Sequence, residues 1–228
     1  MATAVPASVT QTPSSASKNT LIRRVLNFVM GADDDDSLNA VALDALNSAV
    51  ALINSRKWYK LFSNTDLTMA ADTSTYGLPA DFKEPMSAFE LNSSDERNQR
   101  IPYLPLKSML DERPIATTSG NPQTYGINYG TRQFTFDIPP SSSFVSRVPQ
   151  VRIYYYKRIP ELTDTSQTIG ADPEFDWYVV WSARREIAAI RDPQKYSLAD
   201  REAERFLREL RRSDTDQMTD HSVFGGYS

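Results

Sequence analysis

Acidic side chains are the first candidates for chemistry in this sequence. Four aspartates occupy residues 33–36, and Asp172 and Glu174 form a separate acidic pair. A calcium loop alternates its ligands with spacer residues and includes a turn glycine, whereas the aspartate run does neither. Aspartates directly before an apolar-periodic segment cap a helix and stabilise its positive end. We therefore interpret the run as a helix cap and expect no metal site.

The pair Asp172 and Glu174 has the chemistry of a hydrolase acid and base. The same two residues flank Pro173 at the start of an expected helix, where capping accounts for them. The sequence contains no cysteine and a single histidine, His221, in a polar C-terminal segment. A thiolate nucleophile, a cysteine-ligated zinc site and a histidine cluster are therefore excluded. We predict no catalytic residue, no cofactor and no enzyme activity.

A basic, aromatic stretch is the candidate for contact with nucleic acid. It reads VRIYYYKRIPELTD over residues 151–164. Stacking rings beside cations are typical of single-strand binding, but alternation with period two is typical of a β-strand. The expected neighbouring strands TYGIN, QFTFDI and SAFEL carry no lysine or arginine, so a positive groove is missing. We favour a strand with Val151, Ile153 and Tyr155 on its apolar face and Arg152, Tyr154, Tyr156 and Arg158 on the other.

The overall charge gives no general attraction to polyanions. The 228 residues include 25 basic and 29 acidic side chains, for a net charge of -4. Such a balance favours neither DNA nor an anionic membrane as a binding surface. The apolar run VALDALNSAVALI is interrupted by Asp44 and Asn47, and the first residues lack a signal-peptide pattern. We expect no membrane contact and synthesis in the cytoplasm.

Helical periodicity identifies the elements that would position these residues. Apolar spacing of three and four predicts helices over residues 20–31, 37–53, 105–114, 172–192 and 195–214. The fourth of these helices has two apolar stripes and therefore needs two packing partners. One stripe is Phe175, Val179, Ala183, Ile187 and Ile190, and the other is Trp177, Val180, Trp181 and Ala188. The second stripe predicts a subunit interface at Trp177, Val180 and Trp181, or else a helix wholly inside its own core.

The middle of the sequence follows the period of β-strands. We expect a hairpin of two short strands within residues 66–82, and further strands at residues 86–91, within 123–140 and at 151–157. The polar residues 92–100 and a serine-rich stretch after Pro140 are expected to be loops. The fold class is therefore α+β. The N- and C-terminal helices would form a bundle, with an antiparallel β-rich, sandwich- or barrel-like domain inserted between them.

The two ends of the sequence differ from the rest. Residues 1–17 carry no charge and consist mainly of Ala, Ser, Thr, Pro and Val. Alone, such a segment buries too little apolar area to offset its ordering entropy. It is either a disordered leader or an extended arm that orders against a neighbouring subunit. Residues 213–228 are polar with the late aromatics Phe224 and Tyr227, and form either a docking peptide or a frayed end.

Four short motifs follow one another along the sequence in a recognisable order. They are YGLPADF (Tyr76, Leu78, Pro79, Asp81, Phe82), NPQTYGI (Pro122, Tyr125), FTFDIPP (Phe136, Pro139, Pro140) and YYKRIPELTD (Tyr155, Pro160, Leu162). An aromatic-rich helix and a charged helix follow them, and the whole series spans roughly residues 37–212. This arrangement resembles the head-to-tail adaptor (connector) proteins of tailed double-stranded-DNA bacteriophages, particularly short-tailed ones.

The resemblance implies a structural protein of the virion, at the head–tail junction and assembled in the host cytoplasm. It implies a ring, usually of twelve copies, that docks on the portal protein and presents a platform to the tail nozzle and tail fibre proteins. Genomic double-stranded DNA would pass through the ring without specific binding, in agreement with the net charge. In this family the C-terminal segment grips the portal, a role that would fall to His221, Val223, Phe224 and Tyr227.

The expected organisation has four parts. Residues 1–17 form the arm, residues 18–62 and 171–212 the helical domain, residues 63–170 the β-rich domain, and residues 213–228 the docking tail. An alternative function is a carbohydrate- or surface-binding β-module, in which Tyr129, Tyr154 and Tyr156 are sugar platforms. That alternative explains the tyrosines but gives the flanking helices no role.

Overall fold

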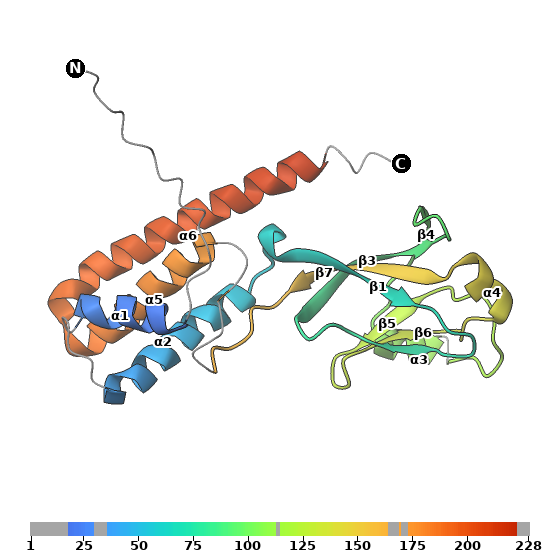
Figure 1. Cartoon of the computed structure of the whole chain (residues 1–228), viewed down its shortest axis with the longest axis horizontal. Helices are drawn as coiled ribbons and strands as arrows, with labels where there is room; N and C mark the ends of the chain where they lie inside the picture. Colours follow the sequence, from blue (N-terminus) through green and yellow to red (C-terminus); the bar gives the residue numbers. More distant parts are fainter. Residues whose placement is uncertain (1–17, 30–35, 113–114, 164–168, 170–172, 223–228) are drawn as a thin grey trace, which may run out of the picture. The chain divides into compact units, whose positions relative to one another are not determined.

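The computed structural model describes residues 18–29, 36–112, 115–163, 169 and 173–222 (Figure 1). These residues form six α-helices, one 3-10 helix and seven strands in two antiparallel sheets, which confirms the α+β class. The chain divides into two compact units. The sheet unit is Lys57–Arg158, and the parts of the chain before and after it form the helical unit.

The helical unit is organised around one helix. Its members are α1 (Lys18–Val29), α2 (Asp36–Asn54), α5 (Pro173–Arg191) and α6 (Pro193–Ser222). Helix α5 packs against each of the other three. Its side chains Phe175, Val179, Val180 and Ala183 consequently have no exposed surface. The apolar residues on several sides of α5, visible in the sequence, are therefore explained by several covering helices.

Two asparagines of α2 fix the segment that leads from the sheet unit back to the helices. The Asn54 side chain accepts from the Ile159 backbone N–H and donates to the Ile159 carbonyl, both at 2.8 Å. Asn47 does the same for Leu162, at 2.8 and 3.2 Å. The side chains of Ile159 and Leu162 are buried. The IPEL part of the fourth motif is thus a structural anchor, because every backbone group of its buried residues has a partner.

Helix α6 runs further than its sequence predicts. It continues to Ser222, past the expected end near residue 214. Side-chain bonds support these last turns, since Ser213 donates to Glu174 at 3.3 Å and Thr215 to the Arg211 carbonyl at 2.9 Å. The sequence prediction failed because a helix exposed to solvent needs no apolar stripe. Residues 223–228, and with them part of the expected docking tail, lie outside the described residues, as does the arm at residues 1–17.

The sheet unit consists of two sheets on one core. Strands β1 (Phe62–Thr68), β7 (Gln150–Lys157), β3 (Phe82–Leu91) and β4 (Arg97–Ile101) form one sheet, and β2 (Thr75–Gly77), β6 (Gln133–Phe136) and β5 (Tyr125–Asn128) the other, each in that order. Side chains from both sheets share a hydrophobic core, including Val151, Ile153, Phe134 and Phe136. The sheets are not closed into a barrel, which corrects the barrel-like part of the expectation. Their edge strands, such as β2 with three residues, are too short or too polar to join.

The expected hairpin within residues 66–82 is wrong. Strand β1 pairs with β7, with Leu67 opposite Val151, whereas β2 pairs with β6, with Tyr76 opposite Phe134. The turn between them is present, and Asp72 adopts a left-handed φ of 60° while its N–H donates to the Pro140 carbonyl. The chain thus crosses from one sheet to the other. The seven-residue strand β1 forms more hydrogen bonds with the long strand β7 than it could form with the three-residue strand β2. This pairing joins residues far apart in the chain, so the local sequence pattern does not predict it.

Two expected loops contain regular structure. Residues 97–101 form edge strand β4, which pairs with β3 through Ala88 and Ile101. The serine-rich stretch forms helix α4 (Ser142–Arg147), capped by Ser141, whose hydroxyl accepts from the Phe144 N–H. Strand β4 is polar because it is an edge exposed to solvent, where charged residues prevent pairing with other chains. The short helix expected between Pro105 and Pro114 is confirmed as α3 (Leu106–Glu112).

Candidate functional site

The four sequence motifs pair with one another inside the sheet unit. The Tyr155 hydroxyl donates to Asp81 at 3.1 Å, which joins the first motif to the fourth. Burial and this carboxylate raise the pKa of Tyr155 to about 12. Asp137, in the third motif, accepts from the backbone N–H groups of Gln123 and Thr124, in the second, at 3.0 and 3.1 Å. The motif carboxylates therefore hold loops and strands together, as buried acceptors commonly do.

The tyrosine strip of residues 151–157 is confirmed as a sheet strand, β7, between β1 and β3. Val151, Ile153 and Tyr155 lie in the core, as predicted. On the other face, Tyr154 stacks on Phe62 with ring centroids 5.5 Å apart and planes 8° apart. Its ring is only 7% exposed. We call this the tyrosine face; it comprises Phe62, Phe89, Arg97, Arg152 and Tyr154.

Both arginines of the tyrosine face have interaction partners within the sheet unit. Arg97 lies 4.7 Å from the centroid of Tyr154 and donates to its hydroxyl. Arg152 donates to both oxygens of Asp66, at 2.7 and 2.8 Å, and to Asp95 at 3.0 Å. The bond from Arg152 lowers the pKa of Asp66. Sequence reasoning missed Arg97 as a neighbour of the tyrosines because it placed that residue in a loop rather than in β4.

A second group of aromatic and basic side chains lies in the helical unit. Trp177 of α5 stacks on Phe206 of α6 with centroids 5.9 Å apart, and Arg24 of α1 lies 5.0 Å from the Trp177 ring. Trp181 meets Phe28 edge-on at 5.2 Å. We call this group the arginine–tryptophan cluster; it comprises Arg24, Phe28, Trp177, Trp181, Arg184 and Phe206. Contacts of this kind contribute about 0.5–2 kcal/mol each.

The arginines of this cluster contact a backbone carbonyl and aromatic rings. Arg184 donates to the Arg24 carbonyl at 3.0 and 2.6 Å and lies 4.3 Å from the Trp181 ring. Burial, together with the charge of Arg24, lowers the pKa of Arg184 to about 10, which leaves it protonated at neutral pH. Within the described part of the chain no carboxylate lies within ion-pair distance of Arg24 or Arg184. Among the described residues, the positive charge beside Trp177 is therefore uncompensated, and Trp177 is 42% exposed.

The structure separates the three residues predicted for a subunit interface. Trp177 is exposed and Trp181 is partly buried against Phe28. Val180 has no exposed surface, because the helices packed around α5 cover it. Of the residues predicted for portal docking, His221 has helical backbone in α6, and its side chain lies outside the described residues, as do Val223, Phe224 and Tyr227.

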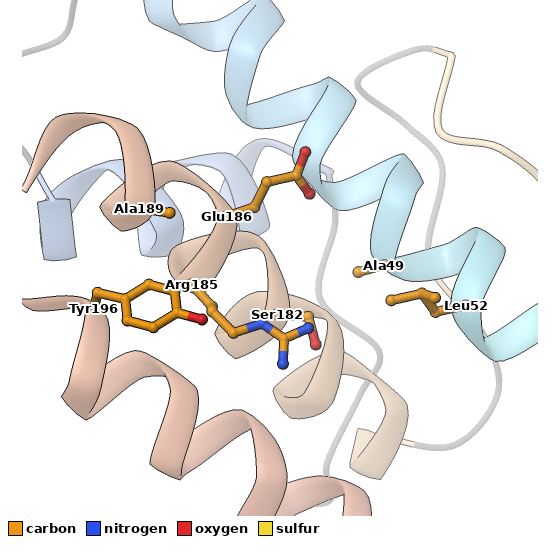
Figure 2. A pocket seen from close by; sticks show the side chains of 7 residues that line it. All are labelled: Ala49, Leu52, Ser182, Arg185, Glu186, Ala189 and Tyr196. Atoms are coloured by element: carbon orange, nitrogen blue, oxygen red, sulfur yellow. The ribbon is translucent and has the colours of Figure 1, made fainter. Parts of the chain in front are cut away.

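A groove opens between α2, α5 and the start of α6 (Figure 2). Its volume is about 260 Å³, and we call it the small-residue groove. Ala49 and Leu52 from α2 lie on one side, opposite Ser182, Arg185, Glu186 and Ala189 from α5 and Tyr196 from α6. The sequence indicated close packing along alanine-rich α2, but a groove assembled from three helices has no local signal.

The polar groups of the groove are unequally satisfied. Arg185 lies 3.3 Å from Asp200 and 3.8 Å from Glu204. Ser182 is buried, and its hydroxyl has no hydrogen-bond partner among the described residues. A buried hydroxyl without a partner costs about 1–3 kcal/mol, a cost that the packing around α5 has to offset.

Neither metal ligation nor membrane insertion has support in the described part of the chain. No group of three or more histidine, cysteine, aspartate or glutamate side chains there could hold a metal ion. None of its helices combines the length and the hydropathy that crossing a bilayer requires.

One comparison with known proteins gives a match. A family model described as SU10 adaptor protein matches residues 18–223. The match thus includes all four motifs, the whole sheet unit and all four helices of the helical unit. No curated protein matches the chain.

Proposed function

The chain belongs to the SU10 adaptor protein family, and we propose that it is the ring-forming adaptor that joins the portal to the tail of a short-tailed phage. Family membership makes it a structural adaptor protein of bacteriophages and a component of the virion. The position at the head–tail junction, the ring and the partners are the proposed part. The proposed partners are the portal protein, the tail nozzle and tail fibre proteins, and further copies of this chain.

The arginine–tryptophan cluster is the observation that carries the proposed ring. Closed rings use heterologous interfaces, in which one patch meets a different patch on the next copy. Tryptophan and arginine are the residues most enriched where such interfaces concentrate their binding energy. The cluster combines the exposed ring of Trp177 with two cations that have no acidic partner among the described residues. A neighbouring copy that offers carboxylates would supply the acidic partner that these cations lack among the described residues.

The length of α6 supports the proposed portal contact. Its 30 residues span about 45 Å at 1.5 Å per residue. Its buried side chains are Ala199, Ala203, Leu207 and Leu210, and from Arg211 to Gln217 the side chains are exposed or intermediate. The end of α6 thus extends beyond the part that packs on α5. Such a helix can present the segment from His221 to Tyr227 to a portal.

Charge supports a passage that does not hold DNA. The net charge is -4. The cations on the tyrosine face are bound to carboxylates or stacked on rings. Duplex DNA carries one phosphate charge per ~1.7 Å, so a basic lumen would bind it tightly. We assign the chain a conduit and a mechanical coupling role, without catalysis.

Light scattering tests this function most simply. The purified full chain is measured alone and together with assembled portal rings from the same virion. We expect multiple copies of the chain to bind each portal ring, and we expect a Trp177→Asp variant to lose this binding. A Tyr129→Asp variant is the matched control, because Tyr129 is also an exposed aromatic residue but lies in the sheet unit. A wild-type chain that stays monomeric and ignores the portal contradicts the proposal.

A carbohydrate-binding module is a second candidate that one observation favours. Tyr129 is 55% exposed and borders a cavity of about 230 Å³ with Lys83, Arg132 and Arg158. Tyr154, by contrast, has its ring faces against Phe62 and Arg97, so it offers no platform to a sugar. Glycan-array binding that is lost in Tyr129→Ala would favour this candidate, and an empty array would reject it.

A further inference from the structure

We propose that the small-residue groove receives the N-terminal arm, residues 1–17, of a neighbouring copy of this chain. The inference rests on the proposed ring, because the donor and the receiver are adjacent subunits. It assigns an occupant to a groove whose contents the described structure leaves open.

The lining of the groove suits an extended, uncharged peptide. Ala49 and Ala189 contribute apolar surface with little side-chain volume, and Leu52 and Tyr196 add larger side chains; Arg185 and Glu186 are the charged residues of the lining. Ser182 also borders the groove, but its hydroxyl oxygen is buried within the helical unit, so it is not among the groups that would contact a peptide. Arg185 is already paired with Asp200, and an acidic peptide would have to compete for it. An extended backbone supplies both donors and acceptors at regular intervals without adding charge.

The arm has the matching composition. It contains no charged residue, and most of its side chains are Ala, Ser, Thr, Pro or Val. Pro6 and Pro13 disfavour a helix and favour an extended conformation. By its composition the arm carries too little apolar surface to form a core of its own, so another surface is the expected place for it to bind.

The arm is also long enough to reach another subunit. It directly precedes α1, which belongs to the same unit as the groove. Seventeen extended residues span roughly 55–60 Å. A domain of about 100 residues has a radius of gyration of about 13 Å, so the arm can cross a neighbouring helical unit.

The groove and the arginine–tryptophan cluster lie on different sides of α5. Twelve residues separate Trp177 from Ala189. At about 100° per residue these positions are about 120° apart around the helix axis. A copy in a ring contacts a neighbour on each side through different patches, and these two surfaces fulfil that condition. An arm that crosses between copies would tie each subunit to the next.

Disulfide cross-linking in the full-length chain tests the proposal cleanly, because the sequence contains no cysteine. An epitope-tagged Val5→Cys or Val9→Cys chain is mixed with an untagged Ala189→Cys chain, assembled on portal rings and oxidised. A disulfide forms only when the two Cα atoms come within about 7 Å. We expect a tagged product of two chains. Ala40→Cys is the control, because Ala40 is exposed on α2 but does not line the groove.

The outcomes distinguish the inference from the proposed function. If no copies collect on the portal, the proposed function fails and the arm proposal fails with it. If a ring forms without the cross-link, or if the control Ala40→Cys links as well as Ala189→Cys, only the arm proposal is overturned. A third chain carries both cysteines, one in the arm and one at Ala189. If the cross-link forms within that chain but not between the two mixed chains, the proposal is also overturned, because the arm would then occupy its own groove.

Discussion

The tyrosine face of the sheet unit and the arginine–tryptophan cluster of the helical unit contain the same kinds of side chain in opposite states of pairing. On the tyrosine face, Arg152 is bound to Asp66 and Asp95, and Tyr154 is stacked and almost fully buried. In the cluster, Arg184 bonds a backbone carbonyl, and Trp177 remains exposed. The tyrosine face satisfies its aromatic and basic groups internally, whereas the arginine–tryptophan cluster leaves Trp177 exposed and its arginines without an acidic partner among the described residues.

Composition alone therefore does not identify a binding surface. The stretch VRIYYYKR suggests polyanion binding more strongly than any part of α5 does. The pairing of each cation decides between them, because a cation already bound to a carboxylate gains little from a phosphate. Our proposal accordingly has partners bind at α5, whereas the contacts of β7 stabilise the sheet unit.

Replacing Tyr154 should have the largest effect on the stability of the single chain. Tyr154→Ala removes a ring that Phe62, Phe89 and Arg97 surround, so we expect a loss of about 3 kcal/mol in the free energy of unfolding. Urea denaturation measures this. Tyr129→Ala, at an exposed ring in the same unit, should cost less than about 1 kcal/mol. Equal losses would show that the tyrosine face is not an internal structure.

Replacing Trp177 should weaken assembly more than it lowers the stability of the single chain. Trp177→Ala should lower the free energy of unfolding by about 1 kcal/mol, because much of the ring is exposed. It should weaken assembly by at least about 2 kcal/mol, as expected for a residue at the centre of an interface. Urea denaturation and the concentration dependence of assembly measure the two effects. If Trp177→Ala assembled at the same protein concentration as the wild type, the proposed difference between the cluster and the tyrosine face would be wrong.

A matched pair of arginine substitutions sharpens it further. Arg152→Met leaves Asp66 and Asp95 without their cation and should cost about 1 kcal/mol. Arg184→Met keeps part of the packing against Trp181 but removes the bonds to the Arg24 carbonyl and the cation–π contact, so the single chain should also lose about 1 kcal/mol. Denaturation at low and at 1 M salt separates the two, because salt should screen only the loss at the Arg152 ion pair. Equal salt dependence of the two losses would contradict different pairing in the two regions.

The smallest expected effect is on the acid limb of stability. The pKa of Asp66 is lowered in the folded chain by its bond to Arg152, whereas unfolded aspartate titrates near its usual ~3.9. The ion pair therefore stabilises the fold above about pH 4, and this contribution is lost as pH falls through the lower folded pKa. Asp66→Asn should be less stable than wild type by up to about 1 kcal/mol at neutral pH and equal to it in acid. Denaturation at pH 2.5 to 7 tests this, and a constant difference would contradict it.

The sequence predicts the elements better than their pairing. The periodicity of α1, α2 and α5 and the alternation of β7 are local, and each was found within a few residues of its bounds. The edge strand β4 was missed because four of its five residues are polar and exposed, although its partner β3 ends close by in the sequence, at Leu91. Helix α4 was missed because its serine-rich stretch has no apolar periodicity. The last turns of α6 were missed because no apolar stripe marks them. The pairing of β1 with β7 is a long-range choice.

The candidate surfaces were only partly predictable. Trp177 was identified from its stripe on α5, but Val180 shares that stripe and is buried, since the number of helices around α5 cannot be counted from one helix. Arg24 comes from α1 and Phe206 from α6, so the cluster exists only after three helices pack. The pairing of Arg152 with Asp66 across two strands was equally out of reach.

Hydroxyl-radical footprinting of the full chain, free and assembled on portal rings, tests the central claim most directly. The method reports the solvent exposure of individual side chains by mass spectrometry, and therefore compares Trp177 and Tyr154 in the same sample. The account predicts that labelling of Trp177 falls several-fold on assembly while the low labelling of Tyr154 stays constant. Unchanged labelling of Trp177, in rings that have formed, would contradict it.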